Sequence, residues 1–359
     1  MVVAMAVMSG FENTLKNAVI DVSGDLIVTK RSRHIEPWGD VDAQLKSMEP
    51  SIKATAAFFQ LEVVAANKGK ILGVMLQGID PVHTPKVLNI QSRLIEGKFD
   101  ISYPGPDKPV PAVVGKEFLK EMNLKMGDVF RVVLPVLDEL NPNAFSRRVG
   151  SFQVAGVVDL GKYEYNQRWV VTHLHATQDL AGTPNKYTGV VVKLFNSETA
   201  RIVAGRLSDK LGAPWWIKDW HSVNENLFEA VKIEKFVVFV VILIIVIAAA
   251  FNVTSTLFIS VVQRFHMISV LKAVGAKSDL IKQIFSLQGL LIGGFGLGLG
   301  LLLGFGMCWG FVWMQKHFLI LTGSVYKIDF IIPEIRAGDW LTIVATTLGI
   351  CWISTLAPA

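Results

Sequence analysis

Hydrophobic and polar positions divide the chain into a mixed first part and a strongly apolar second part. Residues 236–262 contain no Asp, Glu, Lys, Arg or His, so this run is apolar on every side of a helix. It is longer than the roughly 20 residues that a membrane-spanning helix needs. Residues 284–314 and 340–356 are also free of charge. The pattern therefore predicts three complete spanning helices that follow a large domain of mixed polarity.

Amphipathic segments flank the first of these spans. Upstream, residues 225–235 alternate between apolar and charged positions. Downstream, apolar side chains recur at helical spacing among basic residues, and they are Met267, Ile268, Leu271 and Val274. A spanning helix with a structured segment at each end can carry a movement from one side of a membrane to the other.

The domain before residue 236 shows the patterns of both strands and helices. Residues 51–67 and 70–79 are apolar and β-branched, and Asn67-Lys68-Gly69 between them predicts a hairpin. Helices are predicted over residues 38–48 and 116–122. Strands and helices mixed in this order indicate an α+β domain. The predicted fold class is therefore an α-helical membrane protein with a large α+β domain.

A long polar segment, residues 135–150, lies between two predicted strands of this domain. It reads PVLDELNPNAFSRRVG and contains an Asn-Pro-Asn turn signal, a single aromatic residue and two adjacent arginines. An insertion of this length between strands is often a binding loop. The alternative is a solvated hairpin tip, and the residues alone leave both interpretations open.

Charge distribution limits the possible partners and sets the orientation. The net charge is +5, but residues 11–235 hold 28 Lys and Arg against 26 Asp and Glu, so a basic nucleic-acid surface is not expected. The short segment 263–283 carries four Lys or Arg against one Asp, which predicts that it is cytoplasmic. The large domain then lies outside the cytoplasm. Both cysteines, Cys308 and Cys351, fall in apolar runs and are expected to be packing residues.

Glycines recur through the second apolar run. Eight of them lie between Gly293 and Gly310, and several are spaced four residues apart. The pairs are Gly294/Gly298, Gly296/Gly300, Gly300/Gly304 and Gly306/Gly310. Such spacing lets another helix approach closely, although glycine is also simply commoner in membrane helices. We expect tight helix packing here.

Motifs for catalysis are missing from the sequence. It contains no phosphate-binding G-x-x-x-x-G-K-[ST], no G-x-S-x-G and no H-E-x-x-H. His173 and His175 could share one face of a strand, but two histidines without further ligands rarely bind a metal. Asp21 and Asp25 are expected to be solvated carboxylates. We predict no catalytic residue and no metal site, so energy for work on a membrane must come from a partner.

Several stretches resemble one known family. Residues 219–276 read DW–NLFEAVKIEKFVVF–FNVTSTLFISVV–ISVLKAVGA, and further agreement lies in MAVMSGFE at Met5 to Glu12, GVVDLGKYEY at Gly156 to Tyr165 and TLAPA at Thr355 to Ala359. The chain thus resembles the permease subunits of lipoprotein-releasing ABC transporters, the LolC/LolE type, within the wider FtsX/MacB-like permease superfamily. The resemblance covers essentially the whole chain.

The resemblance implies four spans with a periplasmic domain between the first and second. Three spans are complete here, and we expect the sequence to be trimmed at both ends, with a remnant of the first span and without the basic tail. The implied parts are the remnant (1–10), periplasmic domain (11–225), amphipathic lead-in and second span (226–262), cytoplasmic coupling helix and loop (263–283), third span (284–314), short periplasmic loop (315–339) and fourth span (340–359).

The family also implies that the segment after the second span docks into a groove on a separate ATPase. The residues expected to couple to the ATPase are Phe265, Met267, Ile268, Leu271, Lys272, Val274 and Gly275. The family usually has an acidic residue where Met267 stands and another near Gln263, so this chain lacks both and its electrostatic docking is expected to be weaker. From the residues alone, a helix lying on the lipid surface is an equal alternative.

Two further sites follow from the resemblance. Residues expected to face the lipid and the cargo are Leu227, Phe228, Val231, Phe236, Val240, Phe251, Asn252 and Ser255. In one of the two paired subunits, the insertion between the strands recruits a soluble lipoprotein carrier, and the corresponding residues are Pro135, Leu137, Pro142, Phe145, Arg147 and Arg148. Asn252 is the one polar amide deep in its span, and such groups usually pair with another helix or have a function.

The combined prediction is an ATP-driven permease subunit in the bacterial inner membrane that extracts acylated lipoproteins and passes them to a periplasmic carrier. Its expected partners are a cytoplasmic ABC ATPase dimer and a second permease, identical or different. The chain itself needs no cofactor, because ATP and Mg²⁺ bind the ATPase. The alternatives are a MacB-type efflux permease and an FtsX-type signalling subunit that controls cell-wall hydrolases.

Overall fold

The computed structural model describes the chain except for residues 32–33, 36–37, 106, 138–144, 319–332, 335–336 and 357–359. The chain divides into two compact units. One is the domain formed by Leu15–Glu225, and the other contains Met1–Thr14 together with the helices that follow Asn226.

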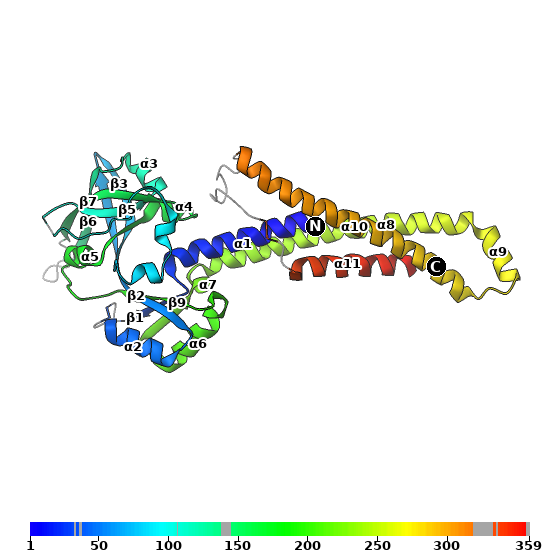
Figure 1. Cartoon of the computed structure of the whole chain (residues 1–359), viewed down its shortest axis with the longest axis horizontal. Coiled ribbons are helices and arrows are strands. Elements are labelled where there is room, and N and C mark those ends of the chain that lie inside the picture. The colour runs from blue at the N-terminus through cyan, green and yellow to red at the C-terminus, as the bar shows by residue number, and fades with distance from the viewer. Residues whose placement is uncertain are drawn as a thin grey trace. The chain divides into compact units, whose positions relative to one another are not determined.

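Helices occur in both units, and Figure 1 shows them in chain order. Those that begin before residue 225 are α1 (Val2–Ser23), α2 (Trp38–Met48), α3 (Lys116–Met122), α4 (Tyr163–Arg168), α5 (Leu174–Ala181), α6 (Ala200–Leu211) and α7 (Trp220–Val223). The others are α8 (Glu225–Gln263), α9 (Phe265–Ala273), α10 (Ser278–Phe318) and α11 (Ala337–Leu356). Short 3₁₀ turns cover Thr84–Lys86, Ile90–Arg93 and Ser197–Thr199.

Strands occur in the domain. They are β1 (Leu26–Lys30), β2 (Ile52–Asn67), β3 (Lys70–Ile79), β4 (Leu94–Gly97), β5 (Val110–Gly115), β6 (Val129–Leu137), β7 (Phe145–Val158), β8 (Trp169–His173), β9 (Gly189–Leu194) and β10 (Trp215–Asp219). The hairpin β2–β3 confirms the turn predicted at Lys68-Gly69, where both residues have positive φ angles of 44° and 85°. The helices α2 and α3 also begin and end where the sequence predicts.

Six of these strands close into a ring. Among the described residues, β2 pairs with β3, β3 with β8, β8 with β5, β5 with β7, β7 with β6, and β6 again with β2. Closure removes the open edges that a flat sheet would leave unpaired. Side chains that alternate inward along each strand fill the ring, and they include Val63, Leu76, Phe130 and Phe152. Positions between them, such as Met75 and Gln77, therefore face outward from the ring.

The strand β2 belongs to two layers of the domain. Its second half contributes to the ring, and its first half pairs with β9 over Ile52–Phe58. From β9 the sheet continues through β1 to β10, and α2 and α6 cover one face of this extension. Figure 1 shows β3, β5, β6 and β7 on one side of the domain and β1, β9, α2 and α6 on the other. The α+β prediction for this domain therefore agrees with the structure.

One carboxylate of the domain differs from its prediction. Asp25 is fully buried instead of solvated, and its Oδ2 accepts a hydrogen bond from Leu194 N at 2.8 Å. Lys193 lies 3.3 Å from the same carboxylate. Asp21 forms an ion pair with Arg93 at 2.5 Å. Burial of a charge is tolerated here because backbone and side-chain donors replace water.

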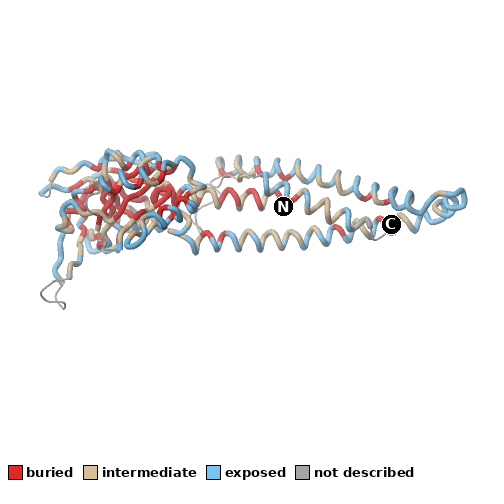
Figure 2. The backbone as a smooth tube through the Cα atoms, turned by 90° about the horizontal axis from the view of Figure 1, so that it is seen from below, coloured by how far each residue is buried: buried red, intermediate tan, exposed pale blue. Residues whose placement is uncertain are grey.

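The second unit consists of long apolar helices. Two described helices are long and apolar enough to cross a membrane, with windows in Glu225–Gln263 and Ser278–Gln315. The apolar part of α11, Trp340–Ile353, is shorter, and α1 continues without a break past the predicted remnant to Ser23. Figure 2 shows buried residues concentrated in the domain and mostly exposed or intermediate ones along these helices. The number of spans stays a prediction.

Glycines of α10 allow close helix contacts at two places. A Cβ on Gly304 would lie 3.0 Å from Val2 Cβ of α1, and a Cβ on Gly293 would lie 2.8 Å from Cys351 Sγ of α11. At the other six glycines of this run, a Cβ would have no described atom of a neighbouring element within 4 Å. Tight packing is therefore seen at two of the eight glycines. The cysteine prediction also agrees, since Cys308 is buried and Cys351 half-buried as free thiols.

Candidate functional site

The predicted coupling segment forms the short helix α9 between two long helices. Arg264 separates it from α8, and six of the seven predicted coupling residues are exposed. The exposed fractions are 68% for Phe265, 60% for Met267, 47% for Leu271 and 83% for Val274. Lys272 and Gly275 are exposed as well, and Ile268 is half-buried. Large apolar side chains on a segment with basic charge indicate a surface that a partner or a lipid layer covers.

The end of α9 is fixed by a compact backbone motif. Gly275 N–H donates to Lys272 O at 3.0 Å, and Ala276 N–H donates to Leu271 O at 3.0 Å. This pair of bonds, with Gly275 at a φ of +100°, is a Schellman ending. Gly275 thus terminates the helix. The motif holds Val274 immediately outside the helix, where its side chain is the most exposed of the group.

The helix α8 joins this segment to the domain without interruption. It runs for 39 residues, so its length is about 58 Å at 1.5 Å per residue. The predicted amphipathic lead-in and second span are therefore one rigid element. Within the helical unit, Lys235 Nζ donates a hydrogen bond to the fully buried Ser9 Oγ of α1 at 3.0 Å.

Residues predicted to face lipid and cargo divide into two groups along α8. Phe236 and Phe251 are 66% and 69% exposed, and Asn252 and Ser255 are exposed too. Leu227 and Val240 are half-buried. Phe228 and Val231 are only 6% and 3% exposed, so they pack inside the protein instead of presenting a free surface. For these two residues the prediction of a lipid-facing side chain does not agree with the structure of the single chain.

Polar groups in the middle of α8 are mostly satisfied by the helix itself. The hydroxyls of Thr254, Ser255 and Thr256 donate to backbone carbonyls four residues earlier, at 2.9–3.0 Å. The Asn252 amide makes no side-chain hydrogen bond to any residue that the structure describes. An exposed amide on an apolar helix is expected to find its partner on another molecule.

The predicted insertion at residues 135–150 is mostly strand. Pro135 pairs with Arg147 and Leu134 with Arg148, so β6 and β7 continue beyond the predicted interruption. Residues 138–144, which include Pro142, lie outside the described part of the chain. The two strands pair up to Leu137 and Phe145. The prediction of a long loop is therefore wrong for residues 135–137 and 145–150, because strand pairing extends the hairpin over them.

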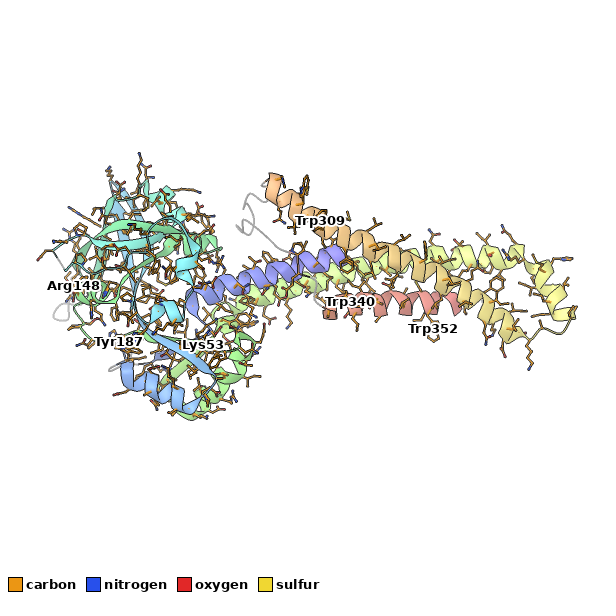
Figure 3. All side chains as sticks on the ribbon, viewed as in Figure 1. Lys53, Arg148, Tyr187, Trp309, Trp340 and Trp352 are labelled. Carbon is orange, nitrogen blue, oxygen red and sulfur yellow. The ribbon has the colours of Figure 1, made fainter. Side chains whose placement is uncertain are left out.

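The two arginines of this hairpin are both exposed, and one of them has a defined position. A Cβ on Gly182 would lie 1.8 Å from Arg148 Nη1, so the guanidinium rests against the residue that ends α5. Figure 3 shows Arg148 at the edge of the domain. A cation at a helix C-terminus is favourably placed relative to the backbone carbonyls there.

The histidines at 173 and 175 do not share a strand face. His173 ends β8, and its Nδ1 accepts a hydrogen bond from His175 N at 3.0 Å to cap α5. Burial and the neighbouring His175 lower the pKa of His173, which agrees with a neutral ring that accepts a hydrogen bond. In the described part of the chain, no group of three or more His, Cys, Asp or Glu side chains could hold a metal ion.

Asp159 organises the turn that follows β7. Its carboxylate accepts from Lys116 Nζ at 2.6 Å, Asn166 Nδ2 at 2.8 Å and Gly161 N at 3.0 Å. Burial alone raises the pKa of this carboxyl, but the hydrogen bonds and the Lys116 charge outweigh it and lower the pKa to about 2. Asn166 Oδ1 in turn accepts from Leu160 N at 2.8 Å. The turn therefore fixes the start of α4.

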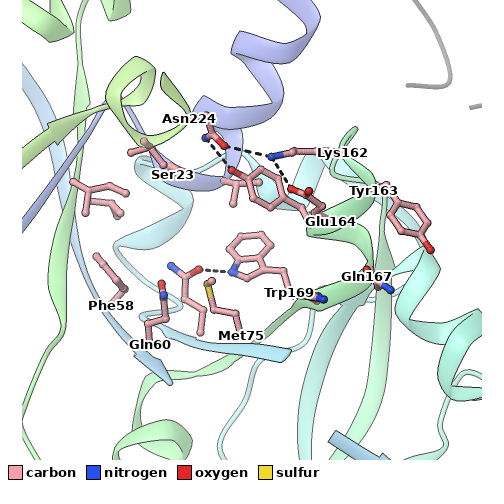
Figure 4. A pocket seen from close by; sticks show the side chains of 17 residues that line it. Ser23, Phe58, Gln60, Met75, Lys162, Tyr163, Glu164, Gln167, Trp169 and Asn224 are labelled. Atoms are coloured by element: carbon pink, nitrogen blue, oxygen red, sulfur yellow. Dashed lines mark hydrogen bonds and ion pairs between the residues drawn. The ribbon is translucent and has the colours of Figure 1, made fainter. Parts of the chain in front are cut away.

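A cavity of about 810 Å³ lies in the domain beneath α4, and sequence reasoning gave no indication of it. Figure 4 shows Phe58, Gln60, Met75 and Trp169 among the side chains that line the cavity. We call this cavity the Gln77 pocket. Its side chains come from strands far apart in the chain, and only the pairing of β2, β3 and β8 brings them together. That non-local pairing is why the sequence carries no visible signal for the pocket.

A second cavity of about 440 Å³ adjoins the first. The two share Met75 and Arg168, and the second reaches Pro135 of β6. At its other end the Gln77 pocket is lined by Ser23, the last residue of α1, and by Asn224, the residue before α8. The two cavities therefore lie side by side across Met75 and Arg168, and the second is lined by Pro135 toward the tip of the β6–β7 hairpin.

Comparisons with known proteins assign both parts of the chain. Residues 1–210 match the family described as MacB-like periplasmic core domain, and residues 239–359 match FtsX-like permease C-terminal. The lipoprotein-releasing system transmembrane protein LolC of Neisseria meningitidis is 26% identical over 100% of this chain and 87% of its own length. LolC of Xylella fastidiosa has the same identity and coverage. LolE of Haemophilus influenzae is 24% identical over 100% of this chain and 87% of its own length.

These matches agree with the resemblance stated from the sequence motifs, and they extend over the domain and the apolar helices alike. The periplasmic core family alone covers more than half of the chain. The chain therefore belongs to the membrane permeases that join a MacB-like periplasmic core domain to an FtsX-like C-terminal region, and within them it is of the lipoprotein-releasing LolC/LolE type.

Proposed function

We propose that this chain is the permease subunit of an inner-membrane ABC transporter that extracts acylated lipoproteins and passes them to a soluble periplasmic carrier. The observation that carries the proposal is similarity to LolC and LolE over the whole chain, from the domain to the apolar helices. ATP would be hydrolysed on a separate ATPase dimer, and a second permease, identical or different, would complete the pair.

The physical task explains the need for ATP. Removing an acyl chain from a bilayer costs about 0.8 kcal/mol for each CH₂ group. A chain of a dozen or more carbons therefore costs on the order of 10 kcal/mol, and a protein with several chains does not leave the membrane unaided. The transporter must supply this free energy and must also offer the chains an apolar surface outside the bilayer.

In this proposal, the helices α9 and α8 carry the movement from the ATPase to the domain. In the proposal, α9 docks into the ATPase through Leu271, Met267 and neighbouring exposed apolar side chains. The continuous helix α8 then transmits its displacement to the domain, because no break in α8 absorbs the motion. Phe236, Phe251 and Asn252 are exposed on α8, where cargo would enter. The β6–β7 hairpin, with exposed Arg147 and Arg148, would receive the carrier.

The experiment reconstitutes the complete transporter with its ATPase in liposomes that contain a triacylated lipoprotein. ATP-dependent appearance of this lipoprotein in soluble complex with a periplasmic carrier is the measured quantity. Leu271→Asp is expected to reduce transfer about tenfold or more, because it places a charge in an apolar contact. The matched control is Leu280→Asp, since Leu280 is 51% exposed on the neighbouring α10 but lies outside α9.

Two results would contradict the proposal in different ways. ATP hydrolysis without any release, with every component present, would exclude lipoprotein extraction and favour an efflux or signalling role. Equal transfer by the Leu271→Asp and Leu280→Asp variants would preserve the transport function but remove α9 from the coupling path.

A further inference from the structure

We propose that the Gln77 pocket binds the acylated amino terminus of the lipoprotein cargo during transfer, with an acyl chain along its apolar wall and an ester or amide carbonyl at Gln77. This inference rests on the proposed function and deepens it. It assigns a lipid-binding site to the domain itself.

The Gln77 side chain is held in one orientation with its donor free. Trp169 Nε1 donates to Gln77 Oε1 at 2.6 Å, and an indole nitrogen can only donate, so the oxygen of the amide must face Trp169. The amide nitrogen then points away from Trp169. Gln77 lines the pocket although it is only 5% exposed, and its nitrogen has no hydrogen-bond partner among the described residues. This nitrogen is a hydrogen-bond donor on the wall of the pocket, and a ligand carbonyl would accept from it.

The surfaces beside Gln77 suit a hydrocarbon chain. Phe58, Trp169 and Val191 are 5%, 3% and 2% exposed and form a well-packed apolar wall. Met75 is 36% exposed, and an unbranched thioether adapts easily to chains of different shape. The volume of about 810 Å³ lies within the range of roughly 300–1,000 Å³ that small-molecule sites occupy.

Charged side chains of both signs line the rim of the pocket. Lys162 Nζ lies 2.9 Å from Glu164 Oε2 and also donates to Asn224 Oδ1 at 3.3 Å. Hydrogen bonding with Lys162, its charge and that of Arg168 lower the pKa of Glu164. The carboxylate of Glu164 therefore offsets one of the two cations that line the pocket. Beside Trp169 the donor is the neutral amide of Gln77, which suits a carbonyl oxygen.

The position of the pocket between two ends of the domain supports transfer. Ser23 and Asn224 line it at the residues where α1 ends and α8 is about to begin. The second cavity shares Met75 and Arg168 with it and continues to Pro135. An acyl chain that slides past Met75 would therefore move from the Gln77 pocket toward the β6–β7 hairpin without crossing the filled interior of the strand ring.

The first test is photocrosslinking in the complete reconstituted transporter. A benzophenone amino acid replaces Met75, and the control places it at Ile71, which is 76% exposed on the same strand and lines neither cavity. The cargo carries a radiolabelled acyl chain. We expect ATP-dependent labelling at position 75 about tenfold above that at position 71.

The outcomes separate this proposal from the proposed function. Normal release with no more labelling at position 75 than at 71 would overturn the pocket assignment while leaving lipoprotein extraction intact. Labelling by radioactive phospholipid but not by cargo would overturn it as well. Failure of the unmodified transporter to release any lipoprotein would contradict the proposed function itself.

The second test uses charge at the same position. Met75→Glu is expected to reduce transfer about tenfold or more, because a carboxylate opposes an acyl chain in the pocket. Ile71→Glu is the matched control and is expected to transfer normally. Gln77→Glu keeps an oxygen for Trp169 but removes the donor, and it is expected to lower transfer with unchanged ATP hydrolysis. Wild-type transfer by Met75→Glu in a folded protein would overturn the proposal.

Discussion

The domain and the long helices place their phenylalanines in opposite environments. In the strand ring, Phe130 and Phe152 are 1% and 2% exposed, whereas Phe251 and Phe295 on the long helices are 69% and 75% exposed. Water drives the first pair into a core, and a bilayer supplies an apolar solvent for the second pair. The tryptophans Trp309 and Trp352 also project outward from their helices, as Figure 3 shows. Exposure of an apolar side chain therefore has a different meaning in each unit.

The helix α9 belongs to neither environment. Its apolar side chains are exposed as on α8, but it lies in the segment whose basic charge predicts contact with the cytoplasm. It is too short, at 9 residues, to cross a bilayer. An exposed apolar surface at that location agrees with the proposal that α9 docks into a protein partner.

The largest effect is expected from a substitution in the core of the strand ring. Phe130→Ala removes a ring that packs against Phe118 and Phe152, and it is expected to lower the free energy of unfolding by about 3–5 kcal/mol. Chemical denaturation of the purified chain, followed by near-ultraviolet circular dichroism, measures the effect. The control is Phe195→Ala, since Phe195 is 73% exposed in the same domain. Equal losses from both variants would contradict the assignment of the core.

A charge on the outside of α8 tests the lipid environment. Phe251→Asp is expected to oppose membrane insertion by about 2.5–3.5 kcal/mol near the centre of a span, while Phe251→Leu is neutral. The fraction of each variant recovered in the membrane after expression measures this effect. If Phe251→Asp inserts as well as Phe251→Leu, then this side of α8 faces water or another protein instead of lipid.

The turn at Asp159 makes a prediction about pH. Its folded pKa of about 2 lies below the ordinary value of 3.8, so the ionised carboxylate stabilises the fold. This stabilisation, on the order of 2 kcal/mol, is complete above about pH 4 and is lost as the pH falls toward 2. Asp159→Asn is expected to lower stability at neutral pH and to flatten the pH dependence between those limits. Denaturation midpoints measured from pH 2 to 7 check it.

The control for this turn is Asp209→Asn. Asp209 is exposed on α6 and makes no ion pair with a described residue. Its replacement should leave the stability and its pH dependence unchanged. A wild-type pH profile for Asp159→Asn would show that the Lys116 contact contributes nothing to the fold.

The smallest effect concerns the end of α9. Gly275→Ala introduces a Cβ at a φ of +100°, which costs about 1 kcal/mol and corresponds to roughly a fivefold change in an equilibrium. We expect a transfer rate lowered severalfold with ATP binding unchanged. Gly338→Ala, in the first turn of α11 with open space around it, is the control and is expected to be silent.

Local structure was predictable where a single stretch of sequence determines it. The β2–β3 hairpin, α2, α3 and the end of α9 at Gly275 follow from turn residues and periodicity over a few positions. Closure of the ring was not predictable, because β6 must meet both β2 and β7, which lie far from one another in sequence. Burial of Asp25 was missed for the same reason, since its donors come from β9.

The candidate sites also differ in how far the sequence alone predicts them. The residues of α9 and α8 are contiguous, so periodicity and family resemblance locate them, although burial of Phe228 and Val231 depends on packing that a helical pattern does not reveal. The Gln77 pocket combines residues from β2, β3, β8, α4 and both ends of the domain. No pattern along the sequence marks such a group, because its residues meet only when the strands β2, β3 and β8 pair.

The strand β2 has a consequence for how the domain opens. Its backbone amides belong to the ring over one half and to the β9 layer over the other, so neither layer can separate without breaking hydrogen bonds of the same strand. Amide hydrogen exchange should therefore report one cooperative unit, with β9 and β3 exchanging at a common rate under conditions where global opening dominates. When α8 is displaced, a domain linked in this manner would therefore move as one unit, and its two layers would not separate from each other.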